Sequence, residues 1–144
     1  MIHVTRRYGF SASHRLHTPS LSEEENRILY GKCNNPFGHG HNYVLEVSVR
    51  GPVDGRTGRA VDPAELDRLV RERVIDELDH KNLNEQIDEF QRIVPTTENL
   101  GLLIHSRLQR AWTEVFPGPW PRLEKVRIAE TPRNIFEVDA NHGS

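Results

Sequence analysis

The sequence predicts a single α+β domain, covering residues 1–144, with strands at both ends of the chain and helices between them. Three observations support this class. Apolar and polar residues alternate near both ends, as they do in strands with one buried face. In the middle, apolar residues recur at helical spacing behind typical helix-starting residues. Hydrophobic residues make up 35% and charged residues 28% of the chain, a balance typical of globular proteins.

The first predicted strand covers residues 2–16. Its apolar face carries Tyr8, Phe10 and Ala12, and His14 continues that face. A lone buried histidine is most simply a core residue bonded to a backbone carbonyl. After this strand, the spacing of a serine and a glutamate in SEEE matches a capping box and predicts a short helix over about 23–30.

The segment Gly31–Tyr43, GKCNNPFGHGHNY, contains the only cysteine of the chain, Cys33, and a His-x-His pair. It leads into a second predicted strand, about 40–51, whose apolar face is extended by His39 and His41. Two such imidazoles can point at one atom, and a catalytic zinc typically has three protein ligands and one open position. With His14 on the inward face of the first strand, a metal site becomes the favoured interpretation.

Turn residues between positions 51 and 62 predict a hairpin tip and a short strand at 59–62. Asp62 and Pro63 then have the N-cap and N1 pattern of a helix, and its apolar stripe continues to Leu78. This pattern indicates an amphipathic helix that covers a sheet.

Asp79 and His80 follow directly after that stripe. A histidine is favoured at a helix C-terminus by the helix dipole, so the pair could be purely structural. Alongside a cysteine and a metal site, an acid/base dyad is the better hypothesis, because histidine titrates near neutral pH and a carboxylate can orient it.

A second long helix is predicted at about 98–114, after the threonines of PTTEN, whose simplest role is capping. Strands at about 122–131 and 134–139 follow. Glu130 lies where the apolar face of the first of these should continue, so it needs a partner. That partner is either an internal arginine or a ligand with paired N–H donors, such as the edge of a pterin or a guanine.

Composition narrows the functional class. The net charge of −2 lacks the excess of basic residues that is typical of nucleic-acid-binding proteins. No apolar run approaches the roughly 20 residues that are needed to span a membrane. With one cysteine and no apolar signal-peptide region at the N-terminus, we expect a protein of the reducing cytoplasm. Eight histidines are many for this length and are a hint of metal.

Several motifs, in order, resemble the 6-pyruvoyltetrahydropterin synthase family: FSASHRL at 10–16, GKCNNP and GHGHNY at 31–43, LDHKNLN at 78–84, PTTEN at 95–99 and AETPRN at 129–134. The resemblance implies the T-fold, an antiparallel four-stranded sheet with two helices on one face. It also implies hexamers of two stacked trimers, whose sheets close into barrels and whose active sites lie between subunits.

The resemblance further implies the roles of individual residues. The zinc ligands would be His14, His39 and His41; the catalytic residues Cys33, Asp79 and His80; and the pterin-binding residues Thr96, Thr97, Glu98 and Glu130. The implied reaction converts 7,8-dihydroneopterin triphosphate to 6-pyruvoyltetrahydropterin with elimination of triphosphate. Arg15, Arg27, Lys32 and Lys81 flank the motifs as candidate triphosphate ligands, and the sequence does not choose among them.

Three alternatives remain open. The related 6-carboxytetrahydropterin synthases of queuosine biosynthesis share the site, although their cysteine usually lies in a shorter loop before His-Gly-His. Side-chain cleavage to a 6-hydroxymethyl pterin occurs where glutamate replaces the cysteine, which Cys33 argues against. A non-catalytic zinc- or pterin-binding protein need not keep Cys33 together with the Asp-His pair.

Two residues, Phe37 and Arg133, depart from the family pattern, and neither is a predicted ligand or catalytic residue.

Overall fold

A computed structural model describes residues 1–140, and its centre is one sheet with the strand order β3-β1-β2-β4-β5. The strands are β1 (Ile2–His14), β2 (His39–Gly51), β3 (Lys81–Asn82), β4 (Arg122–Thr131) and β5 (Asn134–Asp139). The long strands β1 and β2 pair antiparallel over their whole length, and β4 and β5 continue the antiparallel pattern. These four strands confirm the predicted antiparallel sheet.

The sheet has a fifth strand that the sequence did not predict. β3 is two residues long and pairs in parallel with β1, with Ala12 opposite Lys81. Two residues are too few to show an alternating pattern, so this strand exists only because the chain returns to the free edge of β1. The rest of the predicted connection at 81–96 contains two short helices, α4 (Leu83–Gln86) and η3 (Asp88–Gln91).

The turn predicted between positions 51 and 62 is present, but the predicted short strand at 59–62 is wrong. β2 ends at Gly51, and the segment after it closes into a compact turn around Asp54. The Asp54 carboxylate accepts from the backbone N–H groups of Arg56 and Thr57, while its own N–H donates to the Arg59 carbonyl at 2.9 Å. Because these polar groups are satisfied locally, the segment has no need of a neighbouring strand.

The predicted helices are present with the expected starting residues. They are α1 (Glu23–Tyr30), the run of α2 (Pro63–Val70), η2 (Arg71–Ile75) and α3 (Asp76–Leu78), and α5 (Thr97–Val115), with the short helix η1 (Gly31–Asn34) after α1. The capping box of Ser22 and Glu25 begins α1. The carboxylate of Asp62 accepts from Ala64 N–H at the start of α2, and Thr96 caps α5 through Asn99 N–H.

The core lies between the inward face of the sheet and these helices. The sheet contributes Leu45 and Ile128, and the helices contribute Leu66, Leu100 and Ile104, all fully buried. Each such side chain contributes about 1.5–3 kcal/mol through burial. Gly101 lets α5 approach the sheet closely, because a Cβ there would lie 3.2 Å from a methyl carbon of Val138.

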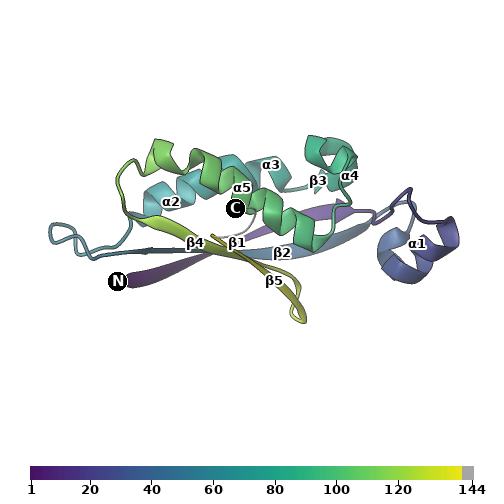
Figure 1. Ribbon diagram of the computed structural model, residues 1–144, viewed down its shortest axis with the longest axis horizontal. Helices are drawn as coiled ribbons and strands as arrows, with labels where there is room; N and C mark the ends of the chain where they lie inside the picture. Colours follow the sequence, from purple (N-terminus) through teal and green to yellow (C-terminus); the bar gives the residue numbers. More distant parts are fainter. Residues whose placement is uncertain (141–144) are drawn as a thin grey trace.

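The arrangement of layers determines where a site can form. Figure 1 shows α2, α3 and α5 on one face of the sheet, while α1 lies beyond one end of it. At that end β1 stops at His14 and β2 starts at His39, directly opposite each other. Among the helices of residues 1–140, none has the length and apolar character needed to cross a membrane.

Candidate metal centre and active site

The inward faces of β1, β2 and β4 bring three predicted site residues together at this end of the sheet. His14 is fully buried at the last position of β1, and His41 lies two residues into β2 on the same face. Glu130 continues the face of Val126 and Ile128 on β4. One of its carboxylate oxygens lies 2.9 Å from His41 Nε2 and 3.7 Å from His14 Nε2, so its neighbours are imidazoles and not an internal arginine.

Cys33 from η1 completes a group of four possible metal ligands. One ligand atom from each of His14, Cys33, His41 and Glu130 lies within 4.8 Å of the others. The Nε2 atoms of both histidines are buried and have no hydrogen bond of standard geometry to any residue in 1–140, despite the nearby carboxylate. Unpartnered imidazole nitrogens beside a thiol and a carboxylate are the donor set that zinc prefers, so these residues fit a zinc ion.

A backbone contact orients the His14 ring. His14 Nδ1 lies 2.9 Å from the carbonyl oxygen of Pro95, just before α5. The carbonyl can only accept, so Nδ1 carries the proton and Nε2 keeps its lone pair free for a metal. Burial lowers the pKa of His14 and also that of His41, against the opposing effect of Glu130 on His41. Both rings are therefore neutral near pH 7, the form that binds metal.

His39, the third predicted zinc ligand, is not part of the four-residue group among the described residues. Its ring packs edge-on against that of His41, with 4.6 Å between the ring centroids. The His39 side chain also lines a neighbouring pocket beyond the end of the sheet. The structure thus brings His14 and His41 together in one group of possible ligands and places His39 beside them.

Cys33 is held near the group by the turn that follows β1. Its carbonyl oxygen accepts from Leu16 N–H at 2.7 Å, which ties η1 to the end of the first strand. Burial raises the pKa of the Cys33 thiol, and the negative charge of Glu130 raises it further. In the chain by itself the thiol is therefore the favoured form, and a thiolate needs positive charge nearby.

Asp79 and His80 lie at the free edge of β1. The Asp79 carboxylate accepts from Ser11 N–H at 2.8 Å and lies 3.1 Å from His80 Nδ1, so the two side chains form a pair. The His80 side chain is 82% exposed and lines a hollow with Ser13 and Asn42, which lie on the outward face of β1 and β2. The same hollow is also lined by His41 but not by Cys33, and among the described residues the dyad lies outside the group that contains Cys33.

His80 also has an unusual backbone conformation. Its φ of 60° lies in the left-handed region. A residue that adopts this conformation just after a helix is usually glycine or asparagine. Its N–H donates to the Ser11 carbonyl at 2.6 Å, which holds the turn against the sheet. A strained residue with an exposed, titratable side chain is typical of a functional position.

The predicted pterin-binding threonines lie at the start of α5. Thr96 caps the helix, whereas Thr97 is buried with a hydroxyl that makes no standard hydrogen bond to a described residue, although it lies near the Tyr43 phenol. Glu98 is exposed in the first turn of the helix. Because Pro95 contacts His14, this stretch adjoins the group of four possible metal ligands.

Comparison with known proteins agrees with this geometry. A family model described as 6-pyruvoyl tetrahydropterin synthase matches residues 3–141. The chain belongs to this family.

Relatives within the family cover almost the whole chain. The 6-pyruvoyl tetrahydrobiopterin synthases of Homo sapiens and Dictyostelium discoideum are 46% and 47% identical to it over 132 residues, which cover 92% of this chain and 87% and 91% of theirs. The structure of Caenorhabditis elegans 6-pyruvoyl tetrahydropterin synthase superimposes with a TM-score of 0.85 and 41% identity, covering 96% of this chain and 94% of that one.

Two contributors to the site of this pterin synthase family member were not identified from sequence. The Pro95 carbonyl orients His14, but every residue has a carbonyl, so no sequence signal marks it. Tyr43 is buried on β2, and its hydroxyl lies 3.5 Å from His14 Nδ1. Its position two residues after His41, on the same strand face, was a signal that could have found it.

Proposed function

We propose that this chain is a lyase that converts 7,8-dihydroneopterin triphosphate to 6-pyruvoyltetrahydropterin with elimination of triphosphate. The observation that carries the proposal is the group of His14, Cys33, His41 and Glu130 in a member of the 6-pyruvoyl tetrahydropterin synthase family. A metal-binding donor set and a thiol within one group are what a proton-shifting elimination needs.

The proposed zinc ligands are His14, His39 and His41. The free Nε2 atoms of His14 and His41 and the ring contact between His39 and His41 support this set. A zinc ion bound here would polarise the side-chain hydroxyls of the substrate and supply the positive charge that favours a Cys33 thiolate. Cys33 would then remove a carbon-bound proton of the substrate side chain.

Glu130 is proposed to anchor the pterin. Its side chain is 13% exposed, and one of its oxygens lies 2.9 Å from His41 Nε2. Among residues 1–140 no lysine or arginine pairs with it, so the carboxylate can still accept from a ligand. A carboxylate can accept two parallel hydrogen bonds from the amino group and ring N–H of a pterin. Such a contact fixes the orientation of the ring, and with it the side chain that reacts. Thr96, Thr97 and Glu98, at the adjoining start of α5, are proposed to line the same pterin pocket.

Asp79 and His80 are proposed as the proton relay, supplied to each site by a neighbouring copy of the chain. The support is that the dyad lies outside the group that contains Cys33 and that the His80 side chain is 82% exposed. A homo-hexamer of two trimers, as the family resemblance implies, would bring the dyad of one copy to the thiol of another. We propose that this assembly works in the cytoplasm, consistent with a chain that has a single cysteine.

Mass spectrometry of the products tests the proposal. Zinc-loaded protein is incubated with 7,8-dihydroneopterin triphosphate, with a Cys33→Ala variant as the control. A pterin that keeps all three side-chain carbons, with released triphosphate, is the expected result. A 6-carboxy pterin with acetaldehyde would instead identify a 6-carboxytetrahydropterin synthase with the same site. No turnover despite bound zinc would favour a binding protein.

A further inference from the structure

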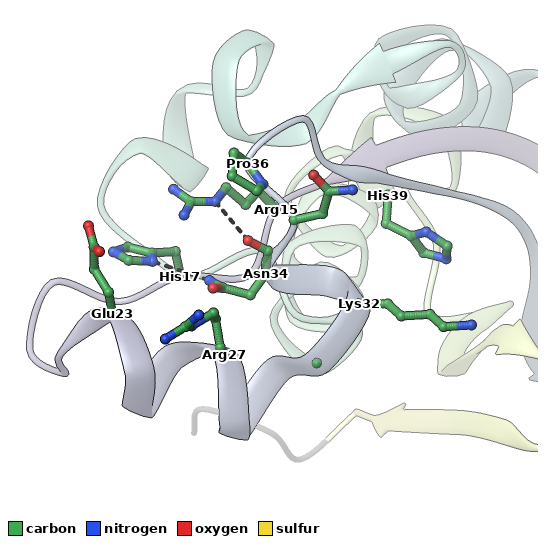
Figure 2. Close-up of a pocket in the computed structure, with 10 residues that line it drawn as sticks. Arg15, His17, Glu23, Arg27, Lys32, Asn34, Pro36 and His39 are labelled. Carbon is green, nitrogen blue, oxygen red and sulfur yellow. Dashed lines mark hydrogen bonds between the residues drawn. The ribbon is translucent and has the colours of Figure 1, made fainter.

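A pocket of about 510 Å³ lies beyond the end of the sheet, next to the metal group. Figure 2 shows that basic side chains reach it from two parts of the chain: Arg15 follows β1, whereas Arg27 and Lys32 belong to the adjoining helices α1 and η1. His39 lies at the end of the pocket that adjoins His41. The volume lies within the range of about 300–1,000 Å³ that is usual for ligand sites. We infer that this pocket binds the triphosphate group of the substrate, an inference that rests on the proposed function for the pterin half.

The charge of the pocket favours an anion. Arg15, Arg27 and Lys32 form no ion pair with any residue in 1–140, and Glu23 is the one acidic residue of the lining. Figure 2 shows the Glu23 carboxylate at the far end from Lys32. By contrast, Arg107 is paired with two glutamates elsewhere in the fold. Three cations against one carboxylate leave an excess positive charge that a polyphosphate would neutralise.

Arg15 is already oriented for such a ligand. Asn84 holds its backbone on both sides, accepting from Arg15 N–H at 2.6 Å and donating to the Arg15 carbonyl at 2.9 Å. Arg15 Nε donates to the Asn34 carbonyl at 3.2 Å. This contact uses one N–H of the guanidinium and leaves its terminal nitrogens for phosphate oxygens, so little side-chain freedom is lost on binding.

The next residues add a further donor. The buried Asn34 side chain donates to the Leu16 carbonyl at 2.7 Å and to His17 Nδ1 at 3.2 Å. With Nδ1 accepting, the neutral His17 ring carries its proton on Nε2, which makes it a second donor on the Arg15 side of the pocket.

The position of the pocket matches the shape of the substrate. A pterin anchored at Glu130 would direct its side chain past His14 and His41, and the pocket begins at His39 beside them. The phosphate chain is at the distal end of that side chain, so it would enter between Lys32 and the two arginines. Three cations spread along the pocket suit an extended triphosphate better than a single phosphate.

Calorimetric titration of the zinc-loaded protein with inorganic tripolyphosphate and with inorganic phosphate tests this inference without turnover. We expect tripolyphosphate to bind at least about tenfold more tightly than phosphate. Arg15→Gln and Arg27→Gln should each weaken tripolyphosphate binding about tenfold, because each removes a charge-assisted contact. Arg56→Gln, an equal change of charge in the exposed turn after β2, should leave it unchanged. Fluorescence titration with 7,8-dihydroneopterin, which lacks phosphate, should give the same affinity in all four proteins.

Equal tripolyphosphate binding by the wild type and both pocket variants would overturn the inference. Tripolyphosphate could also release heat by removing zinc from the protein. That heat would be the same in the wild type and in every variant, so it would count as equal binding and overturn the inference. If the variants lose tripolyphosphate binding and the wild type does not bind 7,8-dihydroneopterin, the pocket stands and the proposed function fails. If 7,8-dihydroneopterin binds and the variants make no difference to tripolyphosphate, the pocket inference alone fails.

Discussion

The imidazole of His14 donates its Nδ1 proton to the carbonyl oxygen of Pro95, across 2.9 Å, and so presents a free Nε2 to the centre of the site. The contact joins the end of β1 to the start of α5, two elements about eighty residues apart in the chain. It explains how a histidine on a buried strand face can serve as a ligand: the backbone satisfies one nitrogen and leaves the other for a metal. The contact expected of a core histidine bonded to a carbonyl is thus also the contact that suits the proposed metal ligand.

The identity of the zinc ligands can be tested by metal analysis of single variants after dialysis. We expect His39→Ala and His41→Ala to lose zinc and Cys33→Ala to keep it, because three imidazoles and an open position suit a catalytic zinc. His3→Ala, at the far end of β1, is the matched control and should retain full occupancy. Full zinc in His39→Ala together with loss in Cys33→Ala would make the thiol a ligand and exclude His39 from the set.

A mixing experiment tests whether the active site is shared between copies. Cys33→Ala and His80→Gln should each be inactive alone. When the two are unfolded, mixed in equal amounts and refolded together, about a quarter of the sites would combine an intact thiol with an intact histidine from another copy. Turnover should therefore recover to about a quarter of the wild-type rate.

The control for this experiment is a mixture of Cys33→Ala with Glu130→Gln. Both residues belong to the same group within one chain, so no site can regain both, and no recovery is expected. If the His80→Gln mixture also stays inactive while wild-type protein refolds with full activity, the shared site is wrong.

The left-handed conformation of His80 predicts a trade-off between stability and activity. With φ at 60°, a side chain with a Cβ costs about 1 kcal/mol relative to glycine. His80→Gly should therefore be more stable than His80→Ala by about 1 kcal/mol in urea unfolding, and both should lack activity. Equal stability of the two variants would show that the turn carries no strain at this residue.

An ion pair between β1 and α2 predicts a pH-dependent contribution to stability. The Asp67 carboxylate accepts from Arg6 Nη2 and from the Tyr8 hydroxyl, each at 2.7 Å. The hydrogen bond from Arg6 is the main cause that holds the pKa of Asp67 below its ordinary value. A carboxyl group with a lowered pKa in the folded state stabilises the protein above its unfolded pKa of about 3.9, and this contribution is lost as the pH falls through the folded value.

Thermal unfolding of Asp67→Asn should therefore show a Tm a few degrees below that of the wild type from pH 8 to about pH 5. The difference should narrow below about pH 4. The effect is modest because the Arg6 side chain is 43% exposed and its charge is screened by water. Asp88→Asn, at an exposed position, provides the control. A Tm difference that stayed constant down to the lowest pH would mean that the Asp67 charge is not its source.

The sequence alone determined most of the fold and the chemical inventory of this protein. Period-two alternation identified the four antiparallel strands, and the caps at Asp62 and Thr96 identified the starts of the long helices, because these signals are local. The same parity placed His14, His41 and Glu130 on inward faces. Local signals missed the two-residue β3, which is too short to show alternation, and wrongly indicated a strand at 59–62 after the turn around Asp54.

Only the tertiary structure decided which of these residues meet. Strand register brings His14 and His41 together, and the path of η1 adds Cys33, while the Asp79–His80 pair lies outside that group. Which cations share a pocket was also beyond the sequence. The position of Arg15 relative to Arg27 and Lys32 depends on contacts such as that of Asn34 with Leu16. Residue type and spacing are local properties, whereas distance between segments is set by the packing of the whole chain.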